Sequence, residues 1–119
     1  MLLSPSDRVA VSNAYSPRER ESIYQVLCAI MKIAGHHTDE KWNFICEVMD
    51  AVGISKEDQK NSRKLNADQM NAALRSMSQI KKIYLAKFMS ITSLIGEARE
   101  RETKFVYGLF RIFEIPEDF

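Results

Sequence analysis

The sequence predicts an all-α protein, a compact bundle of about six or seven helices. Apolar residues recur at helical spacing along most of the chain, and no stretch alternates apolar and polar residues as a strand would. Only four Gly and three Pro occur among 119 residues, too few for a loop-rich all-β domain. With 45% apolar and 28% charged residues, the composition is globular and the length suits one domain over 1–119.

The first part of the chain, 1–15, predicts an N-terminal extension that holds a short helix. We expect this helix to run from about Asp7 to Ala14, with Ser6 as its N-cap.

A helix hairpin follows over 17–54. Its first helix begins at the capping box Ser16-Pro17-Arg18-Glu19, which has Pro at the first helical position, and ends at Gly35. Thr38 is the expected N-cap of the second helix, and Gly53 ends it. Ile54 lies where a Schellman ending places its hydrophobic contact.

Two shorter helices are predicted in the middle of the chain. The spacing Ser55-x-x-Asp58 allows a short helix, and Asn66-x-x-Gln69 opens another. The second of these has its expected buried positions at Met70, Ala73, Leu74 and Met77.

A second hairpin is predicted over 78–115. Its first helix ends at Gly96, and its core positions are expected at Ile80, Ile83, Tyr84, Phe88, Ile91 and Leu94. The last helix runs from about Ala98 to Glu114, and its apolar residues are Phe105, Val106, Leu109, Phe110, Ile112 and Phe113. Gly108 in its middle predicts a close approach of another helix.

The two hairpins align with each other, which suggests an internal repeat. Gly35 and Gly96 are 61 positions apart, and the same shift puts Phe44 on Phe105. We therefore expect pseudo-repeated units at about 17–54 and 78–115, packed into a closed bundle. The alternative is that any two amphipathic hairpins align this well.

This order of elements resembles the tellurite-resistance B (TerB-like) family. The resemblance rests on an apolar helix ending in Gly, a short polar turn, and an acidic-started helix ending in Gly53-Ile54-Ser55, with the pattern recurring later. It covers roughly Glu21 to Phe119 and implies a TerB-like helical fold.

The acidic motif of the family is mostly missing here. In that family each turn carries Asp-Gly, five residues and then Glu, and the acids are thought to help hold a divalent metal. In the first copy Ala34 and Lys41 stand at the acidic positions, and in the second Ile95 and Glu102 do. The glycines are kept while three of the four acids are lost. The resemblance thus implies that the fold is retained without the metal chemistry.

A divalent-metal site is the alternative hypothesis for these turns. Imidazole and carboxylate groups are a plausible ligand set, and the candidates are His36, His37, Asp39, Glu97 and Glu102. However, adjacent histidines point apart, and the i, i+4 spacing that aims two rings at one ion is missing.

Other classes of function find little support in the sequence. A net charge of +1 does not favour a nucleic-acid partner. Cys28 and Cys46 fall in apolar stripes and are expected to be buried thiols, and no nucleophile or phosphate-loop motif is present. The longest apolar run, Val26 to Met31, is too short for a membrane span. We expect a cytoplasmic protein that is not an enzyme and has no cofactor.

These inferences predict a non-catalytic protein-interaction module, which the resemblance links to tellurite or stress response. The alternative is a divalent-metal-binding sensor, and a third hypothesis is a DNA-associated regulator. The apolar C-terminal helix suggests homodimerisation, with an exposed patch expected at Phe110, Phe113 and Phe119. The sequence does not identify a protein partner.

Overall fold

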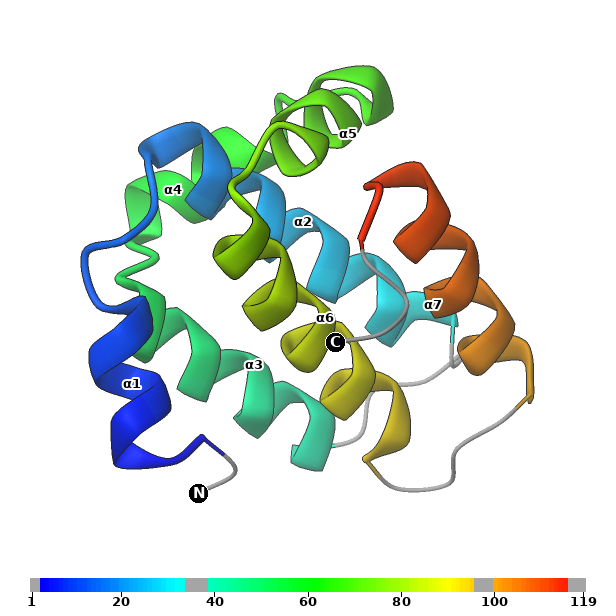
Figure 1. The fold of residues 1–119 in the computed structure, drawn as a ribbon, viewed down its shortest axis with the longest axis horizontal. Coiled ribbons are helices and arrows are strands. Elements are labelled where there is room, and N and C mark those ends of the chain that lie inside the picture. Colours follow the sequence, from blue (N-terminus) through cyan, green and yellow to red (C-terminus); the bar gives the residue numbers. More distant parts are fainter. Residues whose placement is uncertain (1–2, 34–38, 96–99, 116–119) are drawn as a thin grey trace.

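The chain is built from α-helices, as its periodicity predicts. The computed structural model describes residues 3–33, 39–95 and 100–115, and these ranges contain no strand. The helices in them are α1 (Pro5–Val11), α2 (Pro17–Ile33), α3 (Asp39–Val52), α4 (Lys56–Ser62), α5 (Ala67–Arg75), α6 (Gln79–Leu94) and α7 (Glu100–Ile112) (Figure 1). The predicted all-α bundle is confirmed.

Helix α2 is the centre of the bundle. It contacts α3, α4, α5, α6 and α7, and Figure 1 shows it crossing the middle of the molecule between α1 and α7. Ile23, Val26, Leu27 and Ile30 on this helix are fully buried. All of the buried apolar residues in the described ranges except Leu65 form one contiguous core. The radius of gyration of the chain, 13.1 Å, is close to the ~13–14 Å expected for a domain of this length.

Reciprocal capping boxes begin three helices at the positions that the sequence predicts. They join Ser16 to Glu19, Ser55 to Asp58, and Asn66 to Gln69. In each box the N-cap side chain accepts from a backbone N–H three residues on, and the side chain there accepts from the N-cap N–H. Such a cap stabilises a helix start by about 1 kcal/mol.

The prediction for the first helix is wrong by two residues at its start and by three at its end. Helix α1 is capped by Ser4, not Ser6, and it ends at Val11, short of Ala14. Ser4 is the N-cap because Pro5 then takes the first helical position and Asp7 the third. From that position the Asp7 carboxylate accepts from the Ser4 N–H.

Gly53 ends α3 as predicted. Its φ of +86° lies in the left-handed region that favours glycine. The N–H of Ile54 donates to the Met49 carbonyl at 2.9 Å, which is the long hydrogen bond of a Schellman ending. The predicted helix ends at Gly35 and Gly96 and the predicted cap at Thr38 lie outside the described residues.

The predicted core face of α6 is wrong in part. Phe88 is fully buried and Tyr84 and Ile91 are half-buried, but Ile80 and Leu94 are 65% and 59% exposed. The buried face of this helix consists of Lys82, Leu85, Ala86, Phe88, Met89, Thr92 and Ser93. Helix α6 is therefore rotated relative to the face that apolar residues alone indicate.

Two expectations for the C-terminal helix, an exposed aromatic patch and close packing at Gly108, are also wrong. Phe113 is fully buried, so it belongs to the core and not to an exposed patch, and Phe110 is half-buried. Phe119 lies outside the described residues. No described neighbour lies within 4 Å of the Cβ that a side chain at Gly108 would add, so no helix packs closely there.

The open space at Gly108 predicts a stabilising substitution. Gly108→Ala should raise the free energy of unfolding by about 0.5–1 kcal/mol, because glycine in a helix interior has more backbone freedom to lose on folding. Chemical denaturation measures the change. Gly53→Ala is the matched control, since its added Cβ is equally unobstructed but its φ is positive, and it should destabilise. Stabilisation by both substitutions would contradict the conformational argument.

The helix bounds bear on the proposed repeat. Shifting α2 and α3 by 61 positions gives 78–94 and 100–113, close to the observed α6 at 79–94 and α7 at 100–112. Helices α2 and α3 contact each other, as do α6 and α7. Similar bounds alone do not establish that the two hairpins superimpose, so the internal repeat stays a prediction.

Candidate functional site

The predicted metal ligands do not form a common group within the described residues. His36, His37 and Glu97 lie outside them. Asp39 is exposed at the first residue of α3, whereas Glu102 is buried in α7. Across the described ranges, no three His, Cys, Asp or Glu side chains are placed to hold one ion.

Glu102 is instead held by a lysine. The Lys41 Nζ lies 3.1 Å from Glu102 Oε2, and each of the two side chains is only 2% exposed. The same ammonium donates to the Thr92 carbonyl at 2.8 Å and the Ser93 carbonyl at 3.3 Å, near the end of α6. One buried cation therefore links α3, α6 and α7.

This pair leads to a prediction about metal binding. A metal ion at Glu102 would have to displace the Lys41 ammonium. The ammonium would then lose its charged partner in a buried position, which is costly. We expect Zn²⁺, Ca²⁺ and Mn²⁺ to bind no more tightly than about 100 μM in calorimetric titrations. Tighter binding that is lost in Glu102→Gln would support the sensor alternative.

A groove lies where α2 passes α3 and the end of α4. Its volume is about 590 Å³. We call it the α2–α4 groove, and its lining residues are Tyr24, Gln25, Cys28, Ala29, Met31, Lys32, Trp42, Ser62 and Arg63. Tyr24, Cys28 and Lys32 follow one another at four-residue intervals, so they form one stripe along α2.

Three polar groups of this groove affect the Cys28 thiol. Burial raises the pKa of Cys28, and this outweighs the opposing effects of the Tyr24 hydroxyl, Lys32 and Arg63. Burial also raises the pKa of Tyr24 to about 12, helped by its hydrogen bond to Cys28. At neutral pH the groove therefore presents a neutral thiol and a phenolic O–H, together with the Lys32 and Arg63 cations.

Gln25 supplies a further polar atom to the groove wall. Its Nε2 donates to the Leu65 carbonyl at 3.1 Å, which ties α2 to the segment after α4. Its Oε1 is buried and has no hydrogen-bond partner among the described residues. A buried acceptor left in this state costs about 1–3 kcal/mol.

The two cysteines are less buried than the sequence predicts. Cys28 and Cys46 are both half-buried free thiols. Burial raises the pKa of Cys46 as it does that of Cys28. A nucleophilic cysteine needs the opposite shift, because the thiolate is the reactive form.

A second hollow lies between α6 and α7. It has a volume of about 110 Å³ and is lined by uncharged residues, Ser90, Ser93, Leu94, Thr103, Val106, Tyr107 and Phe110, which we call the α6–α7 patch. Tyr107 is 62% exposed, and its ring meets that of Phe110 edge-on with centroids 6.0 Å apart. Tyr107 and Leu94 are thus large apolar groups in contact with solvent.

Sequence reasoning missed the α2–α4 groove and found the α6–α7 patch only in part, through Phe110. The α2–α4 groove combines residues from three helices, and no local motif connects Trp42 with Arg63. The Lys41–Glu102 pair did have a signal, because the two positions are 61 apart, which is the offset of the predicted repeat. Opposite charges at equivalent positions of two hairpins that pack together indicate an ion pair, here between Lys41 and Glu102.

The chain was compared with family models, curated proteins and solved structures. No family model, curated protein or solved structure matches the chain, so the TerB-like resemblance stays a prediction from its sequence. None of the helices in the described ranges combines the length and apolar character needed to cross a membrane.

Proposed function

We propose that this chain is a non-catalytic protein-interaction module whose α6–α7 patch binds a second copy of the chain. The supporting observation is the exposure of Leu94 and Tyr107 side by side with the half-buried Phe110 in one uncharged hollow. Aromatic residues are enriched in the cores of protein interfaces, and charged residues are depleted there. Contact with a partner would remove this apolar surface from water.

The uncharged lining favours a second copy as the partner. In a two-fold dimer the same patch faces itself, so a patch with charges of one sign would face charges of that same sign. No Asp, Glu, Lys or Arg occurs among the described residues that line the α6–α7 patch, so self-contact brings no like-charge repulsion there. The edge-on pair of Tyr107 and Phe110 also limits the side-chain freedom that binding would remove.

The non-catalytic part of the proposal rests on the state of the reactive groups. The raised thiol pKa values of Cys28 and Cys46 disfavour a cysteine nucleophile. Glu102 is engaged by Lys41 and is buried, which leaves it unsuited to act on a substrate. The TerB-like resemblance supports a role of this module in stress response, such as tellurite tolerance, and we propose a cytoplasmic location.

Sedimentation equilibrium over a wide concentration range tests this function. We expect a reversible dimer with a Kd of roughly 1–100 μM, which corresponds to about −8 to −5.5 kcal/mol. Tyr107→Asp should weaken it by at least about tenfold, because it places two like charges in the apolar contact. Val9→Asp is the matched control, since Val9 is 78% exposed on α1 and should leave the Kd unchanged.

Two outcomes would overturn this function. One is a monomer at every concentration up to about 1 mM, which corresponds to about −4 kcal/mol. The other is an equal loss of association in Val9→Asp and Tyr107→Asp, since the contact would then not involve the α6–α7 patch.

A further inference from the structure

We propose that the α2–α4 groove binds a small organic anion, a carboxylate attached to an aromatic body. The inference is independent of the α6–α7 patch. It rests on the size of the groove, on its two cations and on its aromatic walls.

The size of the groove favours a small molecule. Its volume of about 590 Å³ falls within the ~300–1,000 Å³ of small-ligand pockets.

The charge of the groove favours an anion. Lys32 on α2 and Arg63 at the end of α4 both line it, so two positive charges share one groove. The described lining residues include no Asp or Glu, and no ion pair joins either cation to a described carboxylate. An arginine can bind a carboxylate with two parallel hydrogen bonds.

A neutral donor lies in the same groove. The Tyr24 hydroxyl lines the groove beside Cys28, and it keeps its proton at neutral pH because burial raises its pKa to about 12. A bound carboxylate is a strong acceptor, so it would take a hydrogen bond from this hydroxyl.

The rest of the wall suits an aromatic body. Trp42 from α3 is half-buried, and Met31 and Ala29 from α2 lie beside the groove. A methionine thioether and an indole ring both pack favourably against an aromatic ring. The ligand would therefore place its ring toward α3 and its carboxylate toward Lys32 and Arg63.

The chain has a built-in probe of this groove. Trp42 is its one tryptophan, so tryptophan fluorescence reports on the groove wall. Phenylacetate and 3-phenylpropionate are suitable probes because their rings do not absorb where tryptophan is selectively excited. We expect both to change the emission saturably with a Kd below about 1 mM. Phenylacetamide, which has the same shape without the charge, should bind at least about tenfold more weakly.

Charge variants at the mouth of the groove locate the anion. Arg63→Gln and Lys32→Gln should each weaken phenylacetate binding by roughly fivefold or more. Lys64→Gln is the matched control, because it removes the same charge from the next exposed residue, which does not line the groove, and it should change the Kd less than about twofold. These residues are exposed, so the variants should fold normally.

The proposal fails if neither acid gives saturable binding up to about 10 mM, by fluorescence or by the NMR shift of the Trp42 indole N–H. It also fails if phenylacetamide binds as tightly as phenylacetate, or if Lys64→Gln weakens binding as much as Arg63→Gln. Tyr107→Asp should bind phenylacetate normally, so failure of the α6–α7 patch and failure of the groove are distinguishable.

Discussion

Replacing Lys41 by Met is expected to lower the free energy of unfolding by about 3–5 kcal/mol. The substitution leaves the Glu102 carboxylate buried, with its side chain 2% exposed, and removes the ammonium 3.1 Å away that compensates its charge. It also removes the donor of the Thr92 and Ser93 carbonyls. Urea denaturation, read as a shift of the midpoint at constant slope, measures the loss.

A double substitution separates the pair from its parts. Lys41→Met combined with Glu102→Leu replaces both charges by apolar groups, so we expect it to recover most of the stability that Lys41→Met loses. The surface ion pair between Arg8 and Asp50 supplies the control. Asp50 is 81% exposed, and Asp50→Asn should cost less than about 1 kcal/mol.

Additive losses would contradict this account of the pair. If the double variant were destabilised by the sum of its single substitutions, the two charges would not be compensating each other. If Lys41→Met lowered the free energy of unfolding by less than about 1 kcal/mol, the buried pair would contribute no more than an ordinary surface ion pair.

The helix starts show how much of the fold could be predicted from the sequence. A capping box is a local arrangement of four residues, so Ser16, Ser55 and Asn66 identify helix starts without knowledge of the tertiary structure. The left-handed turn at Gly53 is equally local. At the N-terminus Ser4 and Ser6 competed, and the position of Pro5 decided between them.

The orientation of α6 could not be predicted, because three polar residues belong to its buried face. Thr92 is fully buried because its hydroxyl donates to the Phe88 carbonyl at 2.7 Å, and Ser93 donates to the Ser90 carbonyl at 2.9 Å. Lys82 reaches the Glu114 carbonyl at 3.4 Å. With these contacts the polar residues occupy the core face, and Ile80 and Leu94 face solvent.

The candidate site was harder to predict than the fold for a related reason. Lys41 departs from the acidic position of the TerB-like motif, and in one turn alone this suggests a lost ligand. The 61-residue offset of the predicted repeat points to Glu102 as its partner, but only the folded chain shows the contact itself, with Lys41 reaching α6 and α7. The groove around Cys28 depends in the same way on α4, which brings Arg63 to a helix that lies about forty residues earlier in the chain.

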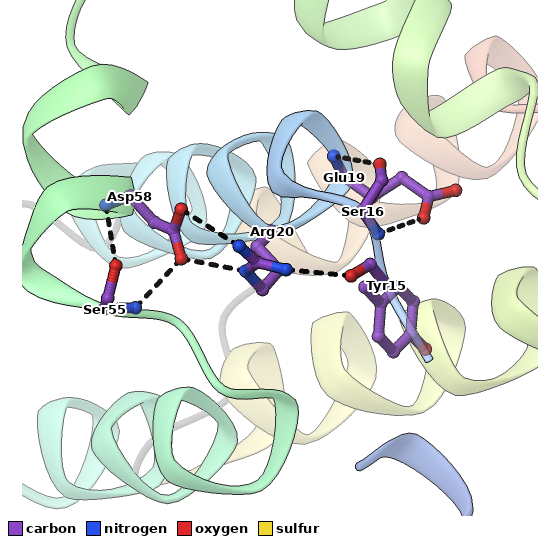
Figure 2. A network of polar contacts seen from close by, with 6 residues as sticks. All are labelled: Tyr15, Ser16, Glu19, Arg20, Ser55 and Asp58. Carbon is purple, nitrogen blue, oxygen red and sulfur yellow. Dashed lines mark hydrogen bonds and ion pairs between the residues drawn. The ribbon is translucent and has the colours of Figure 1, made fainter. Parts of the chain in front are cut away.

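Substitution of Asp58 by Ala is expected to lower the free energy of unfolding by about 2–4 kcal/mol. Figure 2 shows why: Asp58 accepts from the Arg20 Nε at 2.8 Å and from the Ser55 N–H at 3.0 Å, so one carboxylate caps α4 and joins it to α2. Arg20 also donates to the Tyr15 carbonyl at 2.9 Å. Glu57→Ala, an exposed acid in the same helical turn, is the control and should cost less than about 1 kcal/mol.

The pH dependence of Asp58→Asn tests the charge itself. Burial raises the pKa of Asp58, but hydrogen bonds from Arg20 and Ser55 outweigh this effect and hold the pKa below its usual value. A carboxyl whose folded pKa is lowered stabilises the native state above the unfolded pKa of ~3.9, and this contribution is lost as pH falls through the folded pKa. The wild-type protein should therefore be more stable than Asp58→Asn at neutral pH, by a margin that shrinks in acid.

The difference between the two proteins isolates Asp58 from other acids. The Lys87 hydrogen bond lowers the pKa of Asp7, and at Glu19 the Lys81 ammonium and the Ser16 cap outweigh burial to lower the pKa there. Both groups contribute equally to wild type and variant, so their effects cancel in the comparison. Denaturant midpoints measured from about pH 7 down to pH 3 follow this margin. A constant margin over that range would mean that the Asp58 charge does not stabilise the fold, and that Arg20 holds α4 to α2 through its neutral contacts alone.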